Sequence, residues 1–212
     1  MQKAKVYSIF DFEKLALQST QGKAKLRFGI WRNLPRITVY TNDDNDKQNN
    51  YGMITAGLDP SVYSTITQKL NDIVGAPNGT KFKVENYTSS KDNDTGKWKQ
   101  EHVNDILMGK DDAGVIWISV IAEDRPKFKF EFGNFRYHKF YNTDGQELSK
   151  AEISQIATKA TIKLLDNLYA TYLTNNYEHF NPADYKKKGG NNQYNSGNRT
   201  SNYDISDDDI PM

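Results

Sequence analysis

Two helical segments, each preceded by residues that alternate between apolar and polar, constrain the fold of this chain most strongly. The first helix is expected to begin after Asp59, with Pro60 in its first turn, and to end at Gly75, because proline suits the first helical position and glycine ends helices. The second is expected over residues 149–174, opened by a capping box of Ser149 and Glu152. Its expected apolar face comprises Ile153, Ile156, Ala160, Leu164, Leu168 and Tyr172.

The alternating segments read as strands, because side chains of a strand point to opposite faces in turn. The first half should contain strands at 23–31, 36–40 and 51–56, after a lead-in with a short strand at 5–9 and a helical turn at 11–17. The second half should contain strands at 80–87, 98–108, 115–122 and 127–132, the last of which could extend to Tyr141. This order predicts an α+β fold in which antiparallel sheets are each followed by a helix. A five-stranded oligonucleotide/oligosaccharide-binding barrel with added helices is the alternative.

The two halves, 1–76 and 77–180, could have arisen by duplication. The segment that starts at Pro35 resembles the one that starts at Pro126, and the helix starts near Leu58 and Leu148 show nearly the same displacement. The identity is low, so duplication and chance both stay open.

Composition narrows the class of protein further. The chain has no cysteine, which excludes disulfides and thiol catalysis and favours a reducing compartment. No apolar run has the length of a signal peptide or a membrane span. We therefore expect a cytoplasmic protein (in the host cytoplasm if the protein is viral) without membrane contact. The net charge is +1, so a surface for an anionic partner would have to come from charge segregated along the chain.

The last residues carry the most specific pattern. Residues 181–203 are rich in Asn, Gly, Ser and Lys and predict a flexible linker. An acidic tip, 204–212, follows and ends in Asp207, Asp208, Asp209, Ile210, Pro211 and Met212. This arrangement resembles bacterial and phage single-stranded-DNA-binding proteins, whose linker ends in a similar acidic tip with Phe where this chain has Met212. The resemblance implies that the tip recruits a polymerase, helicase or nuclease, with the apolar end as its anchor. A merely solubilising acidic tail is the alternative.

The body resembles a different group. Strands followed by Leu58, Asp59, Pro60 and an amphipathic helix are similar to the positive-cofactor-four coactivators and their Whirly relatives. The resemblance covers residues 22–75 and is echoed in 80–175. It implies strand-rich sheets, used in pairs, that bind unwound DNA, and it makes a homo-oligomer an open expectation for residues 1–180.

A generic binder of single-stranded nucleic acid needs cations along a groove and aromatic rings on which bases stack. The strands interleave both types, whereas many acidic residues lie in expected loops and in the tail. The expected nucleic-acid-binding residues are Lys25, Arg27, Trp31, Arg32, Arg36, Tyr40, Lys81, Lys83, Tyr87, Trp98, Lys99, Arg125, Lys127, Lys129, Arg136, Tyr137 and Lys139. Phe128, Phe130 and Phe132 are expected in the core.

No pattern typical of a catalytic site occurs. His102, His138 and His179 are far apart in sequence, and no phosphate-binding loop is present. We therefore expect a protein that is not an enzyme, has no cofactor or metal, and coats single-stranded DNA without sequence preference in replication, recombination or repair. A transcription cofactor, an RNA-binding chaperone and an interaction protein without nucleic-acid affinity are the alternatives.

Overall fold

The computed structural model describes residues 16–92 and 95–177, which fall into two compact units. The larger unit comprises residues 16–86 and 104–177, and the smaller unit comprises residues 87–103 apart from positions 93 and 94. The expected strand at 5–9, most of the expected helical turn at 11–17, the linker at 181–203 and the acidic tip at 204–212 lie outside the described residues.

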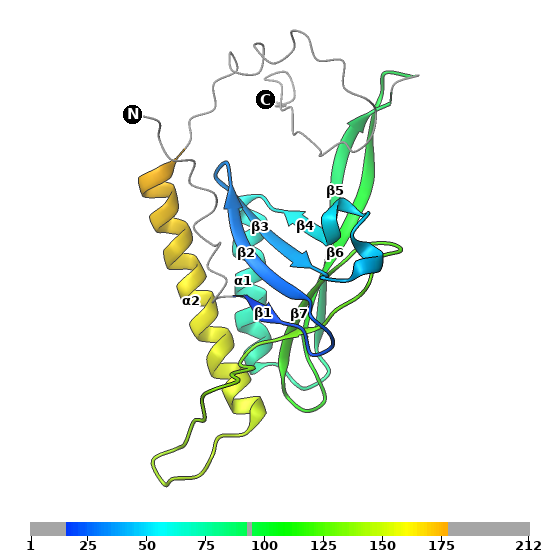
Figure 1. The fold of residues 1–212 in the computed structure, drawn as a ribbon. Coiled ribbons are helices and arrows are strands. Elements are labelled where there is room, and N and C mark those ends of the chain that lie inside the picture. Colours follow the sequence, from blue (N-terminus) through cyan, green and yellow to red (C-terminus); the bar gives the residue numbers. More distant parts are fainter. Residues whose placement is uncertain (1–15, 93–94, 178–212) are drawn as a thin grey trace, which may run out of the picture. The chain divides into compact units, whose positions relative to one another are not determined.

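The first sheet is antiparallel and contains β1 (Leu17–Gln18), β2 (Lys25–Trp31), β3 (Leu34–Tyr40) and β4 (Met53–Gly57), in that order (Figure 1). Short 3-10 turns at Asp44–Asp46 and Asn50–Gly52 connect β3 to β4. Helix α1 (Pro60–Gly75) follows, with Pro60 in its first turn as expected. Its buried side chains include Ile66, Leu70 and Ile73, so one apolar face of this helix packs on the core.

The second sheet is also antiparallel and contains β5 (Lys81–Lys91), β6 (Trp98–Lys110), β7 (Ile116–Ile121) and β8 (Phe130–Glu131), in that order. Helix α2 (Lys150–Asn176) follows and begins with the predicted capping box of Ser149 and Glu152. The α+β class, with two antiparallel sheets each followed by a helix, is thus confirmed. The strands of the described residues do not close into a barrel, so the barrel alternative is wrong.

The core of the larger unit lies between one face of the first sheet, the inner face of the second sheet and the two helices. Strands β2 and β3 alternate buried and half-buried side chains along their length, as a sheet with one packed face requires. The largest fully buried side chains include Leu26, Ile37, Ile66, Leu70, Ile106, Met108, Ile116, Ile118, Phe130 and Phe132. The expected burial of Phe130 and Phe132 is therefore confirmed, and Phe128 is half-buried.

The long strand expected at 127–132 is shorter than the alternation suggested. Only Phe130–Glu131 pairs with β7. The Phe128 carbonyl instead accepts a hydrogen bond from the Ser119 hydroxyl at 2.6 Å, and Phe130 also forms an isolated bridge with Ser19. The chain then leaves the sheet at Gly133, whose φ is 79° and whose added Cβ would lie 3.0 Å from the Ile153 carbonyl oxygen. Close packing on α2 therefore ends the strand.

The buried face of α2 is rotated from the one the sequence predicted. Tyr172 is buried as expected, but Ile156 is 58% exposed and Leu164 is 41% exposed. The face that packs inward instead carries Ser154, Ala157, Thr158 and Leu165. Small side chains allow the helix to approach β7 closely, and the Ser154 hydroxyl accepts a hydrogen bond from the Ile116 amide at 2.9 Å. The close approach of the α2 backbone to β7 therefore determines which face of α2 is buried, and the apolar stripe does not.

The order of strands and helices agrees with a duplication, whereas the resemblance between the segments that start at Pro35 and Pro126 does not. The helix starts at Pro60 and Lys150 are equivalent in the two halves. However, the segment after Pro35 forms β3, the third strand of its sheet, and the segment after Pro126 leads into β8, the fourth strand of the other. Duplication therefore stays a hypothesis that rests on element order alone.

Candidate nucleic-acid interface

The outer face of the first sheet gathers cations and aromatic rings in a small area. The register places Lys25 opposite Tyr40, Arg27 opposite Thr38, and Gly29 opposite Arg36, and residues opposite each other in a sheet share a face. These side chains alternate with the buried positions of β2 and β3 and are half-buried rather than sealed. The strands thus bring together, on one face, Lys25, Arg27, Arg36, Tyr40 and the ring of Trp31.

Trp31 and two guanidinium groups form the densest part of this face, which we call the Trp31 cluster (Trp31, Arg32 and Arg36). The Cζ atom of Arg36 lies 4.2 Å from a ring centroid of Trp31, and that of Arg32 lies 4.6 Å from it. Both distances are within the range of cation–π contacts. Trp31 is nevertheless 42% exposed, so part of the ring remains accessible to a ligand.

Arg36 carries a charge that the described protein does not neutralise. Its Nε atom is buried and has no hydrogen-bond partner among the described residues. Burial, and then the neighbouring charge of Arg32, lower the pKa of Arg36 below its usual value, and no carboxylate opposes this shift. A partly desolvated cation without a counter-ion costs free energy, and an incoming phosphate would offset that cost.

Glycines flank Arg36 on the outer face of the first sheet. Its neighbours across the sheet are Gly29 on β2 and Gly57 on β4, neither of which has a side chain. A Cβ added to Gly57 would meet nothing within 4 Å. On its β4 side, the sheet beside Arg36 is therefore open above Gly57.

A second cation–aromatic pair lies further along the same face. The Cζ atom of Arg27 lies 4.9 Å from the ring centroid of Tyr40. The hydroxyls of Thr38 and Thr55 lie 3.1 Å apart beside this pair. Arg27 and Trp31 are four residues apart on β2, which corresponds to about 13 Å along a strand. Two cationic platforms at this spacing suit an extended strand of nucleic acid better than a single small anion.

The turn that carries Arg32 is held in place by α2. Arg32 and Asn33 have φ values of 49° and 66°, as in the two-residue turns that match the twist of a hairpin. The Tyr169 hydroxyl donates a hydrogen bond to the Asn33 carbonyl at 3.0 Å, and the Tyr169 ring packs 5.2 Å from that of Tyr63. Burial raises the pKa of Tyr169, so its hydroxyl stays protonated and can donate at neutral pH. Sequence patterns could not indicate this support, because Tyr169 lies 136 positions from Asn33.

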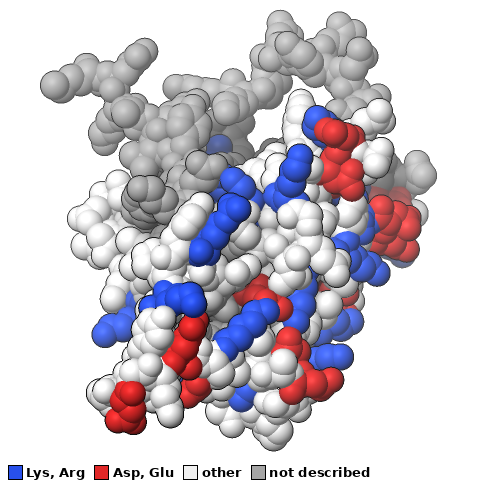
Figure 2. All heavy atoms as spheres, turned by 60° about the horizontal axis from the view of Figure 1, so that its bottom comes forward, with Lys and Arg blue, Asp and Glu red and all other residues white. Residues whose placement is uncertain are grey.

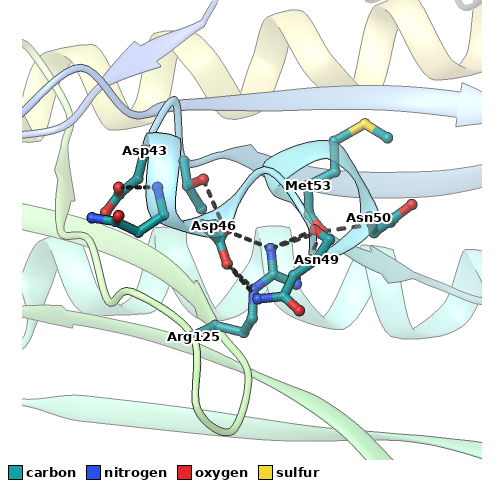
Figure 3. Close-up of polar contacts among 8 residues, drawn as sticks. Asp43, Asp46, Asn49, Asn50, Met53 and Arg125 are labelled. Atoms are coloured by element: carbon teal, nitrogen blue, oxygen red, sulfur yellow. Dashed lines mark hydrogen bonds and ion pairs between the residues drawn. The ribbon is translucent and has the colours of Figure 1, made fainter.

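The other expected cations of the larger unit are less suited to bind phosphate. Arg125 forms a bidentate ion pair with the buried Asp46, at 2.5 and 2.6 Å (Figure 3). The Nζ atom of Lys129 lies 2.7 Å from Oδ2 of Asp111 and 3.4 Å from Oε1 of Glu131. Both charges are engaged in ion pairs within the fold, which makes Arg125 and Lys129 weaker candidates for binding nucleic acid than the sequence suggested. Lys127 is exposed, as predicted.

Strand β5 carries Lys81 and Lys83 on its exposed side, as the alternation predicted. Lys83 forms an ion pair with Glu85 of the same strand. This pair reduces the net positive charge of the row, so Lys81 is the stronger candidate for a phosphate contact here.

Residues 133–148 form an irregular loop with aromatic rings on its surface. Tyr137 is 83% exposed, and the Cζ atom of Arg136 lies 5.7 Å from its ring centroid. Phe135 and Phe140 pack against each other at 5.3 Å, and Lys139 lies 3.2 Å from Glu147. Arg136 and Tyr137 thus form an accessible pair, whereas Lys139 is partly neutralised.

The smaller unit presents its own set of expected residues. Trp98 is 58% exposed, and Tyr87 is 45% exposed with its ring 5.5 Å from that of His102. Lys99 forms an ion pair with Glu101 at 2.6 Å, which raises the pKa of the lysine and lowers that of the acid. The ring of Trp98 is thus the more exposed of the two, and the charge of Lys99 is shared with Glu101.

Figure 2 shows how charge is distributed on one face of the molecule. Lys and Arg side chains form several separate groups, with Asp and Glu between them. The predicted segregation of positive charge is thus local on that face and does not produce a continuous basic band. Local clusters such as the Trp31 cluster must therefore carry any argument for a binding surface.

The described part of the chain offers few features of other site types. Residues 16–92 and 95–177 contain no group of three or more His, Asp or Glu residues placed to hold a metal ion. Neither α1 nor α2 combines the length and the apolar character needed to cross a bilayer. The expected partner-binding residues Asp207, Asp208, Asp209, Ile210, Pro211 and Met212 lie outside the described residues.

Comparison with known proteins adds no assignment, since no family model, no curated protein and no solved structure matches the chain.

Proposed function

We propose that this protein binds single-stranded DNA without sequence preference, through the outer face of its first sheet, and acts in replication, recombination or repair. The observation that supports this proposal most directly is Arg36, a partly buried guanidinium with an unpartnered Nε atom. It stacks on the accessible ring of Trp31. Phosphate binding to the cation and stacking on the ring are the two contacts that sequence-independent binding needs.

The same residues explain why the proposed binding would not depend on the DNA sequence. Arginine, lysine and aromatic rings bind the phosphate chain and the faces of any base, whereas sequence is read by hydrogen bonds to base edges. The side chains between the two cation–aromatic pairs are Thr38 and Thr55, which already contact each other. The acidic tip at 204–212, by its resemblance to bacterial and phage tips, would then recruit a polymerase, helicase or nuclease.

The test is a fluorescence titration with oligo-dT, using the full chain and an Arg36→Ala variant. A hydrogen bond to a charged group contributes about 1.5–3 kcal/mol, so the variant should bind about tenfold to a hundredfold more weakly. Its salt dependence should also lose about 0.7 in slope for the phosphate contact that is removed. Lys47→Ala is the matched control, because Lys47 is an exposed cation paired with Asp44 in the loop after β3.

Two results would contradict the proposal. The first is equal loss of affinity in the Arg36 and Lys47 variants, since the binding would then reflect general charge. The second is binding to a duplex of the same length that is as tight as binding to the single strand. Competition with matched RNA tests the RNA-chaperone alternative, and a polymerase pull-down tests the transcription-cofactor alternative.

A further inference from the structure

The turn that leads into β4 holds three successive residues in the left-handed conformation. Asn50, Tyr51 and Gly52 have φ values of 50°, 54° and 72°. Glycine adopts this conformation at no steric cost and asparagine tolerates it, whereas a bulky side chain rarely does. Tyr51 is therefore the strained residue of the turn, and strain of this kind persists only where the surrounding structure imposes it.

Hydrogen bonds on both sides of Tyr51 impose this conformation. The Asn49 carbonyl accepts hydrogen bonds from the Gly52 amide at 3.0 Å and from Arg125 at 3.1 Å (Figure 3). The Gly52 carbonyl accepts another from the Thr41 amide at 2.8 Å. A Cβ added to Gly52 would lie 2.9 Å from the Thr41 hydroxyl oxygen, so the turn lies close against the end of β3. These contacts fix the backbone without using the Tyr51 side chain.

The Tyr51 ring adds little to the packing of the fold, because the residue is 85% exposed. Glycine or asparagine at this position would give the same backbone with less strain. Burial therefore does not account for a tyrosine here. Strained residues cluster where a protein contacts a ligand, and an exposed ring in such a conformation needs an explanation outside the stability of the fold.

Tyr51 lies at one end of the first sheet. The register pairs Tyr40 of β3 with Met53 of β4, and both occupy half-buried positions on the outer face. Tyr51 precedes Met53 by two residues, so its Cα atom lies within about 8 Å of that of Met53. Trp31 pairs with Leu34 at the opposite end of β3, and the 7 residues of β3 correspond to about 23 Å of strand. Trp31, Tyr40 and Tyr51 therefore follow one another along the sheet.

We propose that Tyr51 is a further contact residue of the single-stranded-DNA surface and that its ring stacks on a base beyond the Arg27–Tyr40 pair. This inference rests on the proposed function and extends the surface past the end of β3. A tyrosine ring stacks on the face of any base, so the contact keeps binding independent of sequence. The fixed turn also presents the ring without the entropic cost of ordering a loop when DNA binds.

The test measures oligo-dT affinity and thermal stability of the full chain in the same variants. Tyr51→Asn removes the ring and introduces a residue that tolerates the left-handed conformation. Its affinity for oligo-dT should fall about fivefold to a hundredfold, as expected for the loss of one stacked base. Its melting temperature should rise by about 2 °C, because strain is relieved. A tyrosine with only a structural role would lose stability when replaced.

Two control variants separate the ring from the turn. Tyr51→Phe keeps the ring and should bind oligo-dT like the unmodified chain. Asn50→Gly is the matched control, because it changes the neighbouring left-handed position of the same turn and removes no ring, so affinity should not change. An unchanged affinity of Tyr51→Asn would overturn the inference, as would a lower melting temperature of this variant or an equal loss of affinity in Asn50→Gly.

The Arg36→Ala variant distinguishes failure of this inference from failure of the proposed function. If Arg36→Ala weakens binding and Tyr51→Asn does not, the binding surface ends at Tyr40 and only the inference about Tyr51 fails. If the unmodified chain does not bind oligo-dT, or if Arg36→Ala and Lys47→Ala lose affinity equally, the proposed function fails and the inference fails with it.

Discussion

The ion pair between Asp46 and Arg125 should hold the two sheets of the larger unit together, and its removal should be costly. Asp46 lies in the loop between β3 and β4, and its side chain is 2% exposed, whereas that of Arg125, in the segment between β7 and β8, is 14% exposed. Asp46 also accepts hydrogen bonds from Thr41 at 2.8 Å and from Asn49 at 3.2 Å. Arg125 donates further to the Asn49 carbonyl at 3.1 Å.

Asp46→Asn removes the negative charge and keeps the size of the side chain. Arg125 would then be buried without a counter-ion, and breaking a buried pair in this way costs about 3–5 kcal/mol. The free energy of unfolding of a domain is about 5–15 kcal/mol, so the variant should fold but with much reduced stability. A second variant, Arg125→Met combined with Asp46→Asn, removes both charges and should be more stable than the sum of the single losses predicts.

The same pair predicts the direction of a pH effect. Hydrogen bonds from Arg125 in the first place, and from Thr41 and Asn49, hold the pKa of Asp46 below its usual value despite the opposing effect of burial. A carboxyl group with a lowered pKa in the folded state contributes stability above its unfolded pKa of about 3.9. That contribution is lost as the pH falls through the lower, folded pKa. The free energy of unfolding of the unmodified chain should therefore decrease below about pH 4, and that of the Asp46→Asn variant should decrease less.

Urea unfolding at pH 7, and at a series of pH values down to 3, measures both effects. The stability reasoning is refuted if Asp46→Asn loses less than about 1 kcal/mol at pH 7. The assignment of the pair as one coupled unit is refuted if the losses of the two single variants add in the double variant. Arg125→Lys keeps the charge but not the bidentate geometry. Its free energy of unfolding should therefore lie between those of the unmodified chain and the Arg125→Met variant.

Two further predictions concern the proposed DNA binding. Tyr169→Phe removes the hydrogen bond to the Asn33 carbonyl but keeps the ring against Tyr63. It should weaken oligo-dT binding by less than about tenfold and lower the free energy of unfolding by about 1 kcal/mol. An unchanged affinity would show that the turn does not need this support. Deletion of residues 204–212 should leave DNA binding equal or tighter and abolish capture of a polymerase, helicase or nuclease in a pull-down, and undiminished capture would contradict the role of the tip.

The sequence predicted the parts of the fold that depend on local patterns. Both helix starts follow from residues that act within one turn, since Pro60 sits at the start of α1 and Ser149 caps α2 through Glu152. The faces of β2 and β3 follow from alternation, which also placed Lys25, Arg27, Arg36 and Tyr40 together. These features need no knowledge of distant residues, because the helical and strand periods alone decide them.

The sequence could not show which cations are already used by the fold. Arg125 and Arg36 look alike as basic residues near a strand and a proline, yet Asp46 lies 79 positions from Arg125. The rotation of α2 also depends on a distant contact, the hydrogen bond between Ser154 and the Ile116 amide. In both cases the outcome depends on which segments meet in the core, and periodicity carries no information about that.

These two arginines show how the fold divides its charges between stability and binding. Arg125 and Asp46 are desolvated together, so each offsets the cost of burying the other, and the charge of Arg125 is balanced within the protein. Arg36 is partly desolvated beside Arg32, with no carboxylate opposing the resulting shift in its pKa. Such a residue lowers the stability of the unliganded protein, and an anion on the outer face of the first sheet would remove that cost when it binds. The second kind of arginine is better suited to bind a polyanion, since a cation already paired within the protein must first give up its partner.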